Sequence, residues 1–391
     1  MAVISVVLEV YLRSWPPPAL QLRMRRLEVD ELADPALRSA RRRKFNTMYA
    51  DDEQLGYRLA ENFYYEWQHS EYSMQVKTNS LALREEREFG PKNALRILTL
   101  GDSFVFGLGV QRSQTFQTFL ERELSKRLSR PVEVINAGVP GYGTCHELVL
   151  LERLLPVLQP DLVLLCFYVG NDLVDNLHCL QAGVNSERIV DGVFVSTKRY
   201  HVRADEVERR GRKGLIGLLL RSYLYNLLEM KIDTLKTQAG VQKKPQTLYK
   251  SVYSFHGKAT DQQARVYAYT RKQLEAMLQI CSGRGTKLAV ALLPAQLQVY
   301  EEMFAEQLVG FSVSSQDYEI DRPNKVLSEM LSQMNVPAID LYEPFRERRG
   351  KDLYYRHDGH WTKRGHRLAA KILEPFLLGL IEVADSSARP D

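Results

Sequence analysis

The sequence predicts a three-layer α/β/α fold, in which helices cover both faces of a central parallel sheet of about five strands. From Leu95 onward, short apolar runs of strand length alternate with longer runs whose apolar residues recur at helical spacing. This alternation is the pattern of a parallel sheet with crossover helices. Polar, glycine-rich clusters follow several of the strand-like runs, as they do at the edge where open α/β sheets bind their ligands. The length of 391 residues leaves room for an N-terminal extension and a mid-chain insertion.

Each strand is expected at a short run rich in β-branched residues and leucine that is bounded by turn residues. The expected strands are residues 96–100, 132–136, 161–168, 286–293 and 337–340. Ser113 is expected to cap the first helix, whose apolar face carries residues 116, 119, 120, 124 and 128. Further helices are expected from about 145 to 158, from 261 to 284 and from about 362 onward, and Pro375 is expected to kink or break the last one.

Outside this alternating pattern, the chain divides into segments of different character. We expect an N-terminal extension at 1–75, a main domain at 76–380 with an insertion at 177–260, and a disordered polar tail at 381–391. The aromatic-rich piece 57–72 is too apolar for a linker and is expected to pack on the main domain. Within the insertion, the apolar stretch 215–228 is too short and too polar to span a membrane. A helix over the rim of the site and an ordinary core helix both fit it.

The N-terminus permits two interpretations. Residues 1–13 are apolar but far shorter than the ~20 residues that a membrane helix needs. They also lack the basic region and the cleavage site of a signal peptide. They fit either the end of a membrane helix, with Glu9 and Arg13 at the interface, or a short amphipathic helix packed on the domain. The first interpretation would give the protein a membrane association through its N-terminus.

Composition excludes several classes of function. The formal net charge is only +5, and the short basic runs are typical of solvated surface, although they could also touch phospholipid head groups or an acidic polymer. No nucleic-acid-binding module is visible, so no nucleic acid partner is expected. No phosphate-binding glycine motif follows a strand, so no nucleotide cofactor is expected. The four cysteines are too few and too scattered for a disulfide framework, and no Cys/His spacing indicates a metal site.

The most informative stretch of the chain runs from Ile97 to Gly107. A buried strand leads directly into Gly101-Asp102-Ser103, which puts a serine at the carboxyl end of a central strand. The glycine permits a tight turn and the close approach of a substrate. Taken alone the motif is weak, because serine and aspartate also cap helices after a strand.

Three later polar clusters supply partners for this serine. They are residues 136–141, Gly170-Asn171-Asp172 and Asp358-Gly359-His360, and each follows a predicted strand or opens a helix. The carboxyl ends of parallel strands share one edge of the sheet, so these clusters can converge on Ser103.

With these four blocks in this order, the chain resembles the SGNH (GDSL-type) hydrolases from about residue 76 to 380. The resemblance implies a flavodoxin-like sheet and an enzyme that hydrolyses an acyl ester. The flanking segments 78–84 and 360–366 resemble bacterial envelope members, which favours a cell-envelope location over the cytoplasm. Many members space the last pair as Asp-x-x-His, whereas this chain has Asp-x-His. The shorter spacing resembles relatives that handle O-acetyl groups on exopolysaccharides.

The residue types in these blocks suit acyl transfer through a catalytic triad. Ser103 is the expected nucleophile, because a neighbouring base can take its proton as it attacks an ester carbonyl. His360 is the expected base, and Asp358 is expected to hold the imidazole in the correct tautomer. The oxyanion hole is expected to use the backbone N–H groups of Ser103 and Gly141 and the side-chain amide of Asn171.

Other polar and aromatic residues near these blocks have less direct roles. Gly138 and Gly143 are alternatives to Gly141 in the oxyanion hole. Asp102 and Asp172 are expected to cap helices and fix loops. Tyr142 and Trp361 either stack on a sugar ring or pack in the core, and His366 is expected to be a surface or packing residue.

Three functions stay open at this point. The first is a serine esterase that hydrolyses an acyl ester, with O-acetyl on a carbohydrate as one candidate. The second is an O-acyltransferase that uses the same triad on a carbohydrate or envelope polymer. The third, from a different class, is a non-catalytic carbohydrate-binding scaffold. The first two predict an acyl ester or an acylated carbohydrate as substrate.

Overall fold

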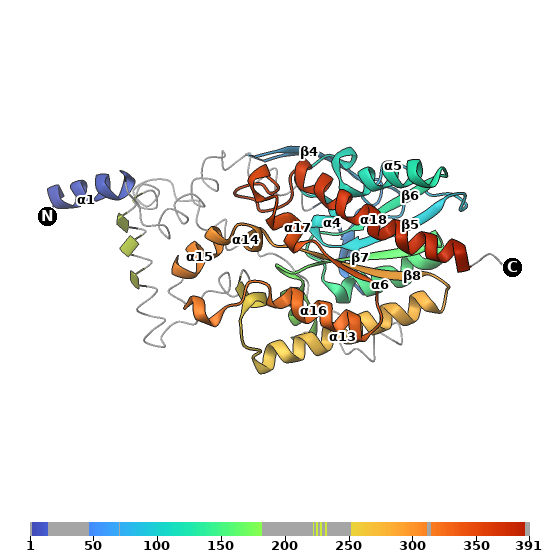
Figure 1. The fold of residues 1–391 in the computed structure, drawn as a ribbon. Coiled ribbons are helices and arrows are strands. Elements are labelled where there is room, and N and C mark those ends of the chain that lie inside the picture. Colours follow the sequence, from blue (N-terminus) through green and yellow to red (C-terminus); the bar gives the residue numbers. More distant parts are fainter. Residues whose placement is uncertain are drawn as a thin grey trace.

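A five-stranded parallel sheet forms the centre of the protein (Figure 1). The structure is a computed structural model that describes residues 2–14, 47–69, 71–181, 252–310 and 314–387, with short pieces between 222 and 232. The strand order is β6-β5-β7-β8-β9. The strands are β5 (Leu95–Gly101), β6 (Val132–Gly138), β7 (Leu162–Tyr168), β8 (Lys287–Leu293) and β9 (Ala338–Asp340). The expected α/β/α fold is therefore confirmed.

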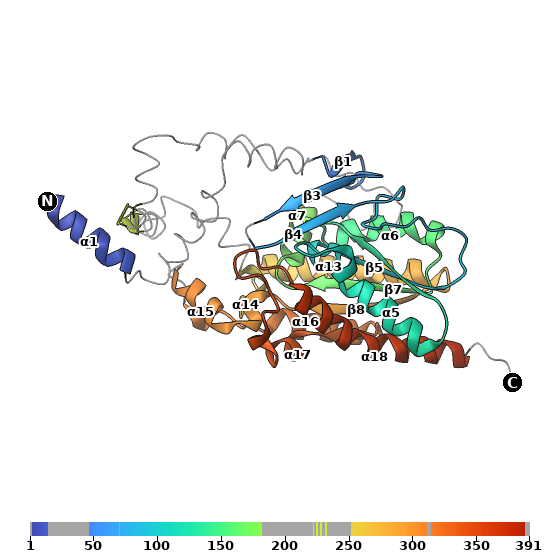
Figure 2. The same cartoon turned by 90° about the horizontal axis from the view of Figure 1, so that it is seen from above.

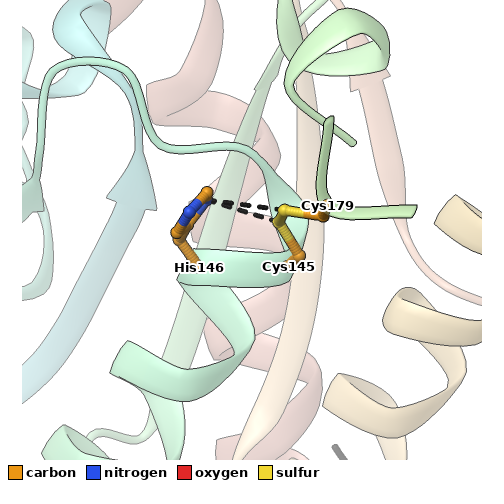
Figure 3. Close-up of side chains that lie close together, drawn as sticks. All are labelled: Cys145, His146 and Cys179. Carbon is orange, nitrogen blue, oxygen red and sulfur yellow. Dashed lines mark hydrogen bonds between the residues drawn. A yellow bond between two sulfur atoms is a disulfide. The ribbon is translucent and has the colours of Figure 1, made fainter. Parts of the chain in front are cut away.

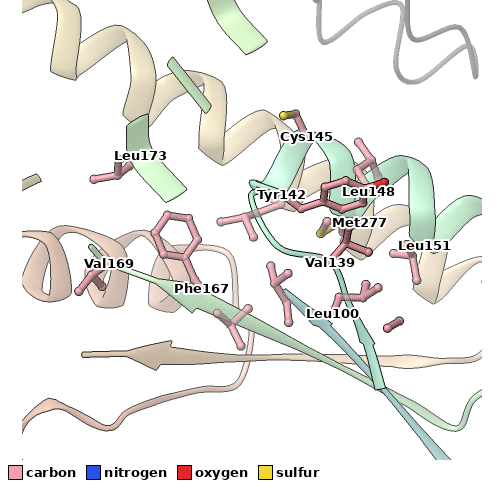
Figure 4. Close-up of a cluster of buried hydrophobic side chains, with 14 of the residues drawn as sticks. Leu100, Val139, Tyr142, Cys145, Leu148, Leu151, Phe167, Val169, Leu173 and Met277 are labelled. Carbon is pink, nitrogen blue, oxygen red and sulfur yellow. The ribbon is translucent and has the colours of Figure 1, made fainter. Parts of the chain in front are cut away.

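Helices cover both faces of this sheet (Figures 1 and 2). One face carries α5 (Phe116–Leu128) and α18 (Lys363–Ser387), and the other carries α6 (Thr144–Leu158), α13 (Asp261–Ser282) and α16 (Arg322–Gln333). Because side chains alternate along a strand, Ile97 enters the core beneath α5, whereas Leu98 and Leu100 enter the core beneath α6. Figure 4 shows part of this second core, where Leu100, Phe167 and Met277 gather. The central strands are thus buried on both faces, as parallel strands usually are.

The described chain contains further helices and 3₁₀ turns. They are α1 (Ala2–Ser14), α4 (Ser103–Phe106), α7 (Asp172–Gln181), α14 (Gln296–Val299), α15 (Glu301–Gly310) and α17 (Tyr342–Arg346), with 3₁₀ turns at 112–114, 253–255, 315–317 and 349–351. Within the described ranges, none of the helices has both the length and the apolar character needed to cross a membrane.

The start of α5 differs from the sequence expectation. Thr115 is the N-cap residue, and Ser113 lies instead in the 3₁₀ turn before the helix. That turn is tied down by Arg112, whose guanidinium bonds the carboxylate of Glu85 at 2.7 Å. The α-helix therefore begins only at Phe116, whose side chain is buried in the core.

The C-terminal helix corrects two further expectations. α18 runs through Pro375 without a break, and residues 381–387 continue the helix where a disordered tail was expected. The reason is the apolar stripe formed by Leu373, Leu377 and Ile381, which are all buried at intervals of four residues. Their burial outweighs the backbone hydrogen bond that the proline cannot donate. Residues 388–391 lie outside the described part of the chain.

Two antiparallel hairpins precede the main sheet and pack on it. They are β1 (Tyr49–Asp52) with β2 (Gly56–Leu59), and β3 (Tyr64–Gln68) with β4 (Ser73–Lys77). Met48, Leu59, Met74 and Val76 are fully buried in the same core as Leu100. The aromatic-rich piece thus packs on the main domain as expected.

Most of the expected insertion at 177–260, including most of the apolar stretch 215–228, lies outside the described residues. Its first residues belong to α7, and near its end Val252, Tyr253 and Phe255 are buried in the core. Apart from the start of the C-terminal tail, the domain boundaries expected from the sequence stay a prediction.

Candidate active site

Ser103 stands at the end of the central strand, at the first residue of the short helix α4. Asp102 caps this helix, because its carboxylate accepts from the N–H of Phe104 at 2.8 Å. Gly101 allows the sharp exit from β5, since a Cβ there would overlap the side chain of Val105 and the carbonyl oxygen of Cys166. The expected helix-capping role of Asp102 is confirmed. Ser103 is left at the carboxyl edge of the sheet with 9% of its surface exposed.

The structure brings Ser103, His360 and Asp358 into one hydrogen-bonded series. His360 Nε2 lies 2.7 Å from Ser103 Oγ, and His360 Nδ1 lies 2.6 Å from Asp358 Oδ1. Ser103 Oγ is also 3.4 Å from a carboxylate oxygen of Asp102, but the much shorter contact with His360 decides where its proton points.

A tight turn explains how an aspartate and a histidine two residues apart can interact. Asp358 Oδ1 accepts from the backbone N–H of His360 at 3.3 Å as well as facing its ring nitrogen. Gly359 between them has a φ of +84°, a left-handed conformation that favours glycine. The turn is closed on both sides by hydrogen bonds between Tyr355 N and His360 O and between Gly359 N and Tyr355 O. The Asp-x-His spacing is therefore compatible with a triad geometry.

The charge state of Asp358 fixes the tautomer of His360. Burial alone would raise the pKa of Asp358, but the hydrogen bond and charge of His360, the charge of His69 and the hydrogen bond from Tyr72 together hold this pKa below its usual value. An ionised carboxylate can only accept, so the 2.6 Å contact requires a proton on Nδ1. The lone pair of Nε2 then faces the Ser103 hydroxyl, which is the arrangement a general base needs.

Two loops flank Ser103 and carry the expected oxyanion donors. β5 lies between β6 and β7 in the sheet, so the loop with Gly141 follows the neighbour on one side and Asn171 follows the neighbour on the other. Gly138 and Gly143 are weaker candidates, because Gly138 N donates to Asn136 Oδ1 at 3.0 Å and Gly143 N donates to His146 Nδ1 at 3.3 Å.

Gly141 itself is held by the N-terminal hairpin β1–β2. Its φ is +83°, and a Cβ there would lie 2.7 Å from the hydroxyl of Tyr57. That hydroxyl donates to the carbonyl of Pro140 at 2.8 Å. Both the conformation and the close contact therefore require glycine at this position.

Asn171 begins the turn into α7 and contacts the serine motif through its side chain. Its amide lies close enough to the carboxyl group of Asp102 to lower the pKa of that group, against the larger opposite effect of burial. Its Oδ1 is buried and has no hydrogen-bond partner among the described residues. A side-chain amide carries two N–H groups, so Asn171 can donate to an oxygen at the serine edge.

Three carboxyl groups are buried together beneath the serine. Burial raises the pKa of Asp102 to about 6 and raises those of Asp172 and Glu147 well above their usual values. Asp172 fixes the loop after β7 by accepting from Tyr168 N at 2.8 Å, as expected. Glu147, on α6, was not singled out in the sequence, and neither of its carboxyl oxygens has a partner among the described residues. It is therefore held in its neutral form.

A disulfide joins the two helices that follow the oxyanion loops (Figure 3). Cys145 lies in the first turn of α6, shortly after Gly141, and Cys179 lies in α7, which begins directly after Asn171. His146 Nδ1 lies 3.3 Å from the sulfur of Cys145 and 3.9 Å from that of Cys179. This disulfide was not expected, because a sequence separation of 34 residues carries no local signal. With their sulfur atoms joined, these cysteines offer no thiolate to a metal ion.

Other predicted residues prove to be part of the core. Tyr142 is 0% and Trp361 is 1% exposed, so the sugar-stacking alternative for both is wrong. His366 is also buried, and its Nδ1 accepts from the N–H of Phe116 at 3.3 Å. Burial and the charge of Arg84 lower its pKa to about 3, which keeps the ring neutral in the core.

The N-terminal hairpin β3–β4 supplies two contacts to the triad loop that were not predicted. The hydroxyl of Tyr72 donates to Asp358 Oδ2 at 3.1 Å. The carboxylate of Glu71 accepts from the backbone N–H groups of His357 and Asp358, the latter at 2.9 Å. These partners are separated by 286 or 287 residues, so no spacing or periodicity could reveal them.

Two family models match the chain and together include all the blocks described above. Residues 99–221 match the GDSL-like lipase/acylhydrolase family, and residues 248–386 match the SGNH hydrolase-like domain of the acetyltransferase AlgX. Both models are of SGNH (GDSL-type) hydrolases, the family that the chain resembles in each of these two segments. Members of this family act on acyl esters or acylated carbohydrates. A comparison with curated proteins found no match.

Solved structures with similar chains include several esterases. The lipase/acylhydrolase from Enterococcus faecalis is 15% identical, with 73% of this chain and 95% of that chain covered and a TM-score of 0.37. The acetyl xylan esterase AlAXEase is 15% identical, with 71% and 97% covered and a TM-score of 0.37. The esterase EstA from Pseudoalteromonas sp. is 12% identical, with 74% and 99% covered and a TM-score of 0.36.

Proposed function

We propose that the protein is a serine esterase of the SGNH type that uses Ser103, His360 and Asp358 as its triad. The observation that supports this proposal most is the hydrogen-bonded series from Ser103 Oγ through His360 to Asp358, with contacts of 2.7 and 2.6 Å. Ser103 Oγ attacks the ester carbonyl while His360 Nε2 takes its proton and later returns it to the leaving alcohol. Asp358 stabilises the imidazolium that forms in between. Water then releases the acyl group by the same steps in reverse.

The oxyanion of the tetrahedral intermediate accepts from the N–H groups of Ser103 and Gly141 and from the amide of Asn171. The flanking positions of the β6 and β7 loops support this assignment, as does the conformation of Gly141. Donors of this kind are each worth about 3–4 kcal/mol of transition-state stabilisation in measured cases. The carboxyl of Asp102 interacts with that amide and lies 3.4 Å from Ser103 Oγ, but the proton of Ser103 passes to His360, whose Nε2 is closer at 2.7 Å.

An O-acyltransferase is the second candidate, and one specific finding favours it. The match over residues 248–386 is to a domain described as that of an acetyltransferase, and this range includes the Asp-x-His turn. In a transferase the acyl group passes from Ser103 to a sugar hydroxyl in place of water. The substrate would be an O-acylated carbohydrate or envelope polymer, with the enzyme in the bacterial cell envelope and associated with the membrane through its N-terminus.

A non-catalytic scaffold is the least supported alternative. A scaffold would have no need to keep a serine, a histidine and a carboxylate in hydrogen-bonding order, with the imidazole tautomer fixed by an ionised aspartate. The intact series therefore favours an enzyme.

Covalent labelling tests the proposal directly. A fluorophosphonate probe should label the wild-type protein at Ser103, as mapped on the peptide, and should not label Ser103→Ala. The control variant Ser80→Ala removes a serine hydroxyl that donates to the exposed Glu88, and it should be labelled normally. Absence of labelling in the wild-type protein would refute the enzyme proposal.

Product analysis then separates the two enzyme classes. With an acetylated sugar as donor, an esterase releases free acetate at a rate that is independent of added acceptor sugar. A transferase instead forms a newly acetylated acceptor and releases less acetate as the acceptor concentration rises.

A further inference from the structure

The N-terminal hairpin β3–β4 reaches the proposed triad through Tyr72. Its hydroxyl donates to Oδ2 of Asp358 at 3.1 Å, while Oδ1 of the same carboxylate faces His360 Nδ1. Each oxygen of Asp358 therefore has its own fixed partner. A carboxylate held at both oxygens cannot rotate, and so the oxygen that orients the imidazole stays in place.

We propose that Tyr72 is a positioning residue for the reaction: its hydroxyl fixes the Asp358 carboxylate that orients His360. The inference rests on the proposed function, because it assigns Tyr72 a role in the same site. Tyr72 touches neither Ser103 nor His360 and acts only through Asp358.

Several contacts hold the Tyr72 ring where its hydroxyl can reach the carboxylate. His69 stacks on it with ring centroids 4.5 Å apart, and the ring of Tyr355 packs against it at 4.9 Å. The backbone of the same hairpin turn is tied to the aspartate loop by Glu71, whose carboxylate accepts from the N–H of Asp358 at 2.9 Å. Tyr72 is itself buried, with 9% of its surface exposed. These contacts hold the Tyr72 hydroxyl in place next to the Asp358 carboxylate.

The electrostatics agree with a donating hydroxyl. Burial and the charge of Asp358 raise the pKa of Tyr72 far above its usual value, so the phenol keeps its proton. In return the hydrogen bond from Tyr72 helps to lower the pKa of Asp358. The ionisable groups that face Asp358 are His360 on its own turn, Glu71, His69 and Tyr72 on the hairpin, and Tyr355.

The test removes only the hydroxyl. Tyr72→Phe keeps the ring and its packing, and the matched control Tyr355→Phe removes a neighbouring hydroxyl that donates to the carbonyl of Gly109 at 2.9 Å and not to the triad. We expect Tyr72→Phe to slow fluorophosphonate labelling of Ser103 by about tenfold, equivalent to ~1.4 kcal/mol, because the Asp358 carboxylate loses the hydrogen bond at one of its oxygens. Tyr355→Phe should retain the wild-type rate.

A second measurement does not depend on catalysis. The titration of the Asp358 carboxyl carbon, followed by NMR in the full chain, should shift to higher pH in Tyr72→Phe and stay unchanged in Tyr355→Phe. An unchanged titration in Tyr72→Phe, or an equal loss of labelling in both variants, would overturn the role of Tyr72. If the proposed function itself is wrong, the result is different: the probe does not label the wild-type protein at Ser103.

Discussion

At the scale of single residues, the sharpest question is what Asp358 contributes. Replacing it by asparagine keeps the shape of the side chain but presents an amide that favours the wrong tautomer of His360. The expected result for Asp358→Asn is a loss of turnover that approaches the ~10⁴ known for the same change in a serine protease. Activity should recover partly at higher pH, where unprotonated imidazole becomes available. Turnover of a short-chain ester across pH measures this.

The control for this prediction is Asp352→Asn, which alters an exposed carboxylate that pairs with Arg364. It should have wild-type turnover. A loss of less than about tenfold in Asp358→Asn, equivalent to ~1.4 kcal/mol, would reduce the site to a Ser-His pair.

Glu147 allows a prediction about stability and pH. Burial, followed by the charges of Asp102 and Asp175, raises its pKa well above the usual 4.5. Above that usual value the unfolded chain releases the proton and the folded protein keeps it. Folding stability therefore falls as pH rises, by up to about 1.4 kcal/mol per pH unit from this group. Glu147→Gln removes this loss, so its melting temperature relative to wild type should increase steadily from about pH 5 to pH 8.

Thermal unfolding of Glu147→Gln, wild type and the exposed control Glu302→Gln over this pH range checks the sign. A constant difference between Glu147→Gln and wild type at every pH would mean that Glu147 is ionised in the folded protein. Glu302→Gln should follow the wild-type curve.

At the scale of elements, the Cys145–Cys179 disulfide stabilises the contact between α6 and α7. It closes a segment with a sequence separation of 34, for which the chain-entropy estimate is about 2–4 kcal/mol. Reduction of the wild-type protein should therefore lower its melting temperature and slow Ser103 labelling, because both oxyanion loops lead into the joined helices. The double variant Cys145→Ser/Cys179→Ser should show the same losses without reductant and no further change with it. If reductant still lowers the melting temperature or the labelling rate of the double variant, the effect of reduction comes from a group other than this disulfide.

The elements also show what sequence can and cannot predict. The strand ends were predictable because a parallel sheet places all its carboxyl ends at one edge, which is why Ser103 and His360 could be paired across 257 residues. The start of α5 and the end of α18 were not, because local capping and proline rules compete there with burial of Phe116 and Ile381. Tyr72 lay beyond prediction, since its contact with Asp358 joins two segments with no shared motif.

At the scale of the whole molecule, the N-terminal hairpins and the C-terminal turn form one unit. Glu71 bonds two backbone N–H groups of the turn that carries Asp358 and His360. Glu71→Ala should therefore increase hydrogen exchange both in the hairpin turn and in residues 355–360. Glu66→Ala, on the same hairpin, removes a carboxylate that bonds Tyr64 and Gln75, and it should leave exchange at 355–360 unchanged. Equal exchange in the two variants would show that the hairpin and the turn open independently.

The turn at Gly359 has a consequence for how this site tolerates movement. Asp358 and His360 belong to one closed loop, which Tyr354 and Trp361 bridge at its base. A displacement of that loop carries the carboxylate and the imidazole together, so their mutual geometry survives while the gap to Ser103 opens or closes. A residue that holds the backbone of the loop from outside, as Glu71 does, therefore helps to set the distance between His360 and Ser103.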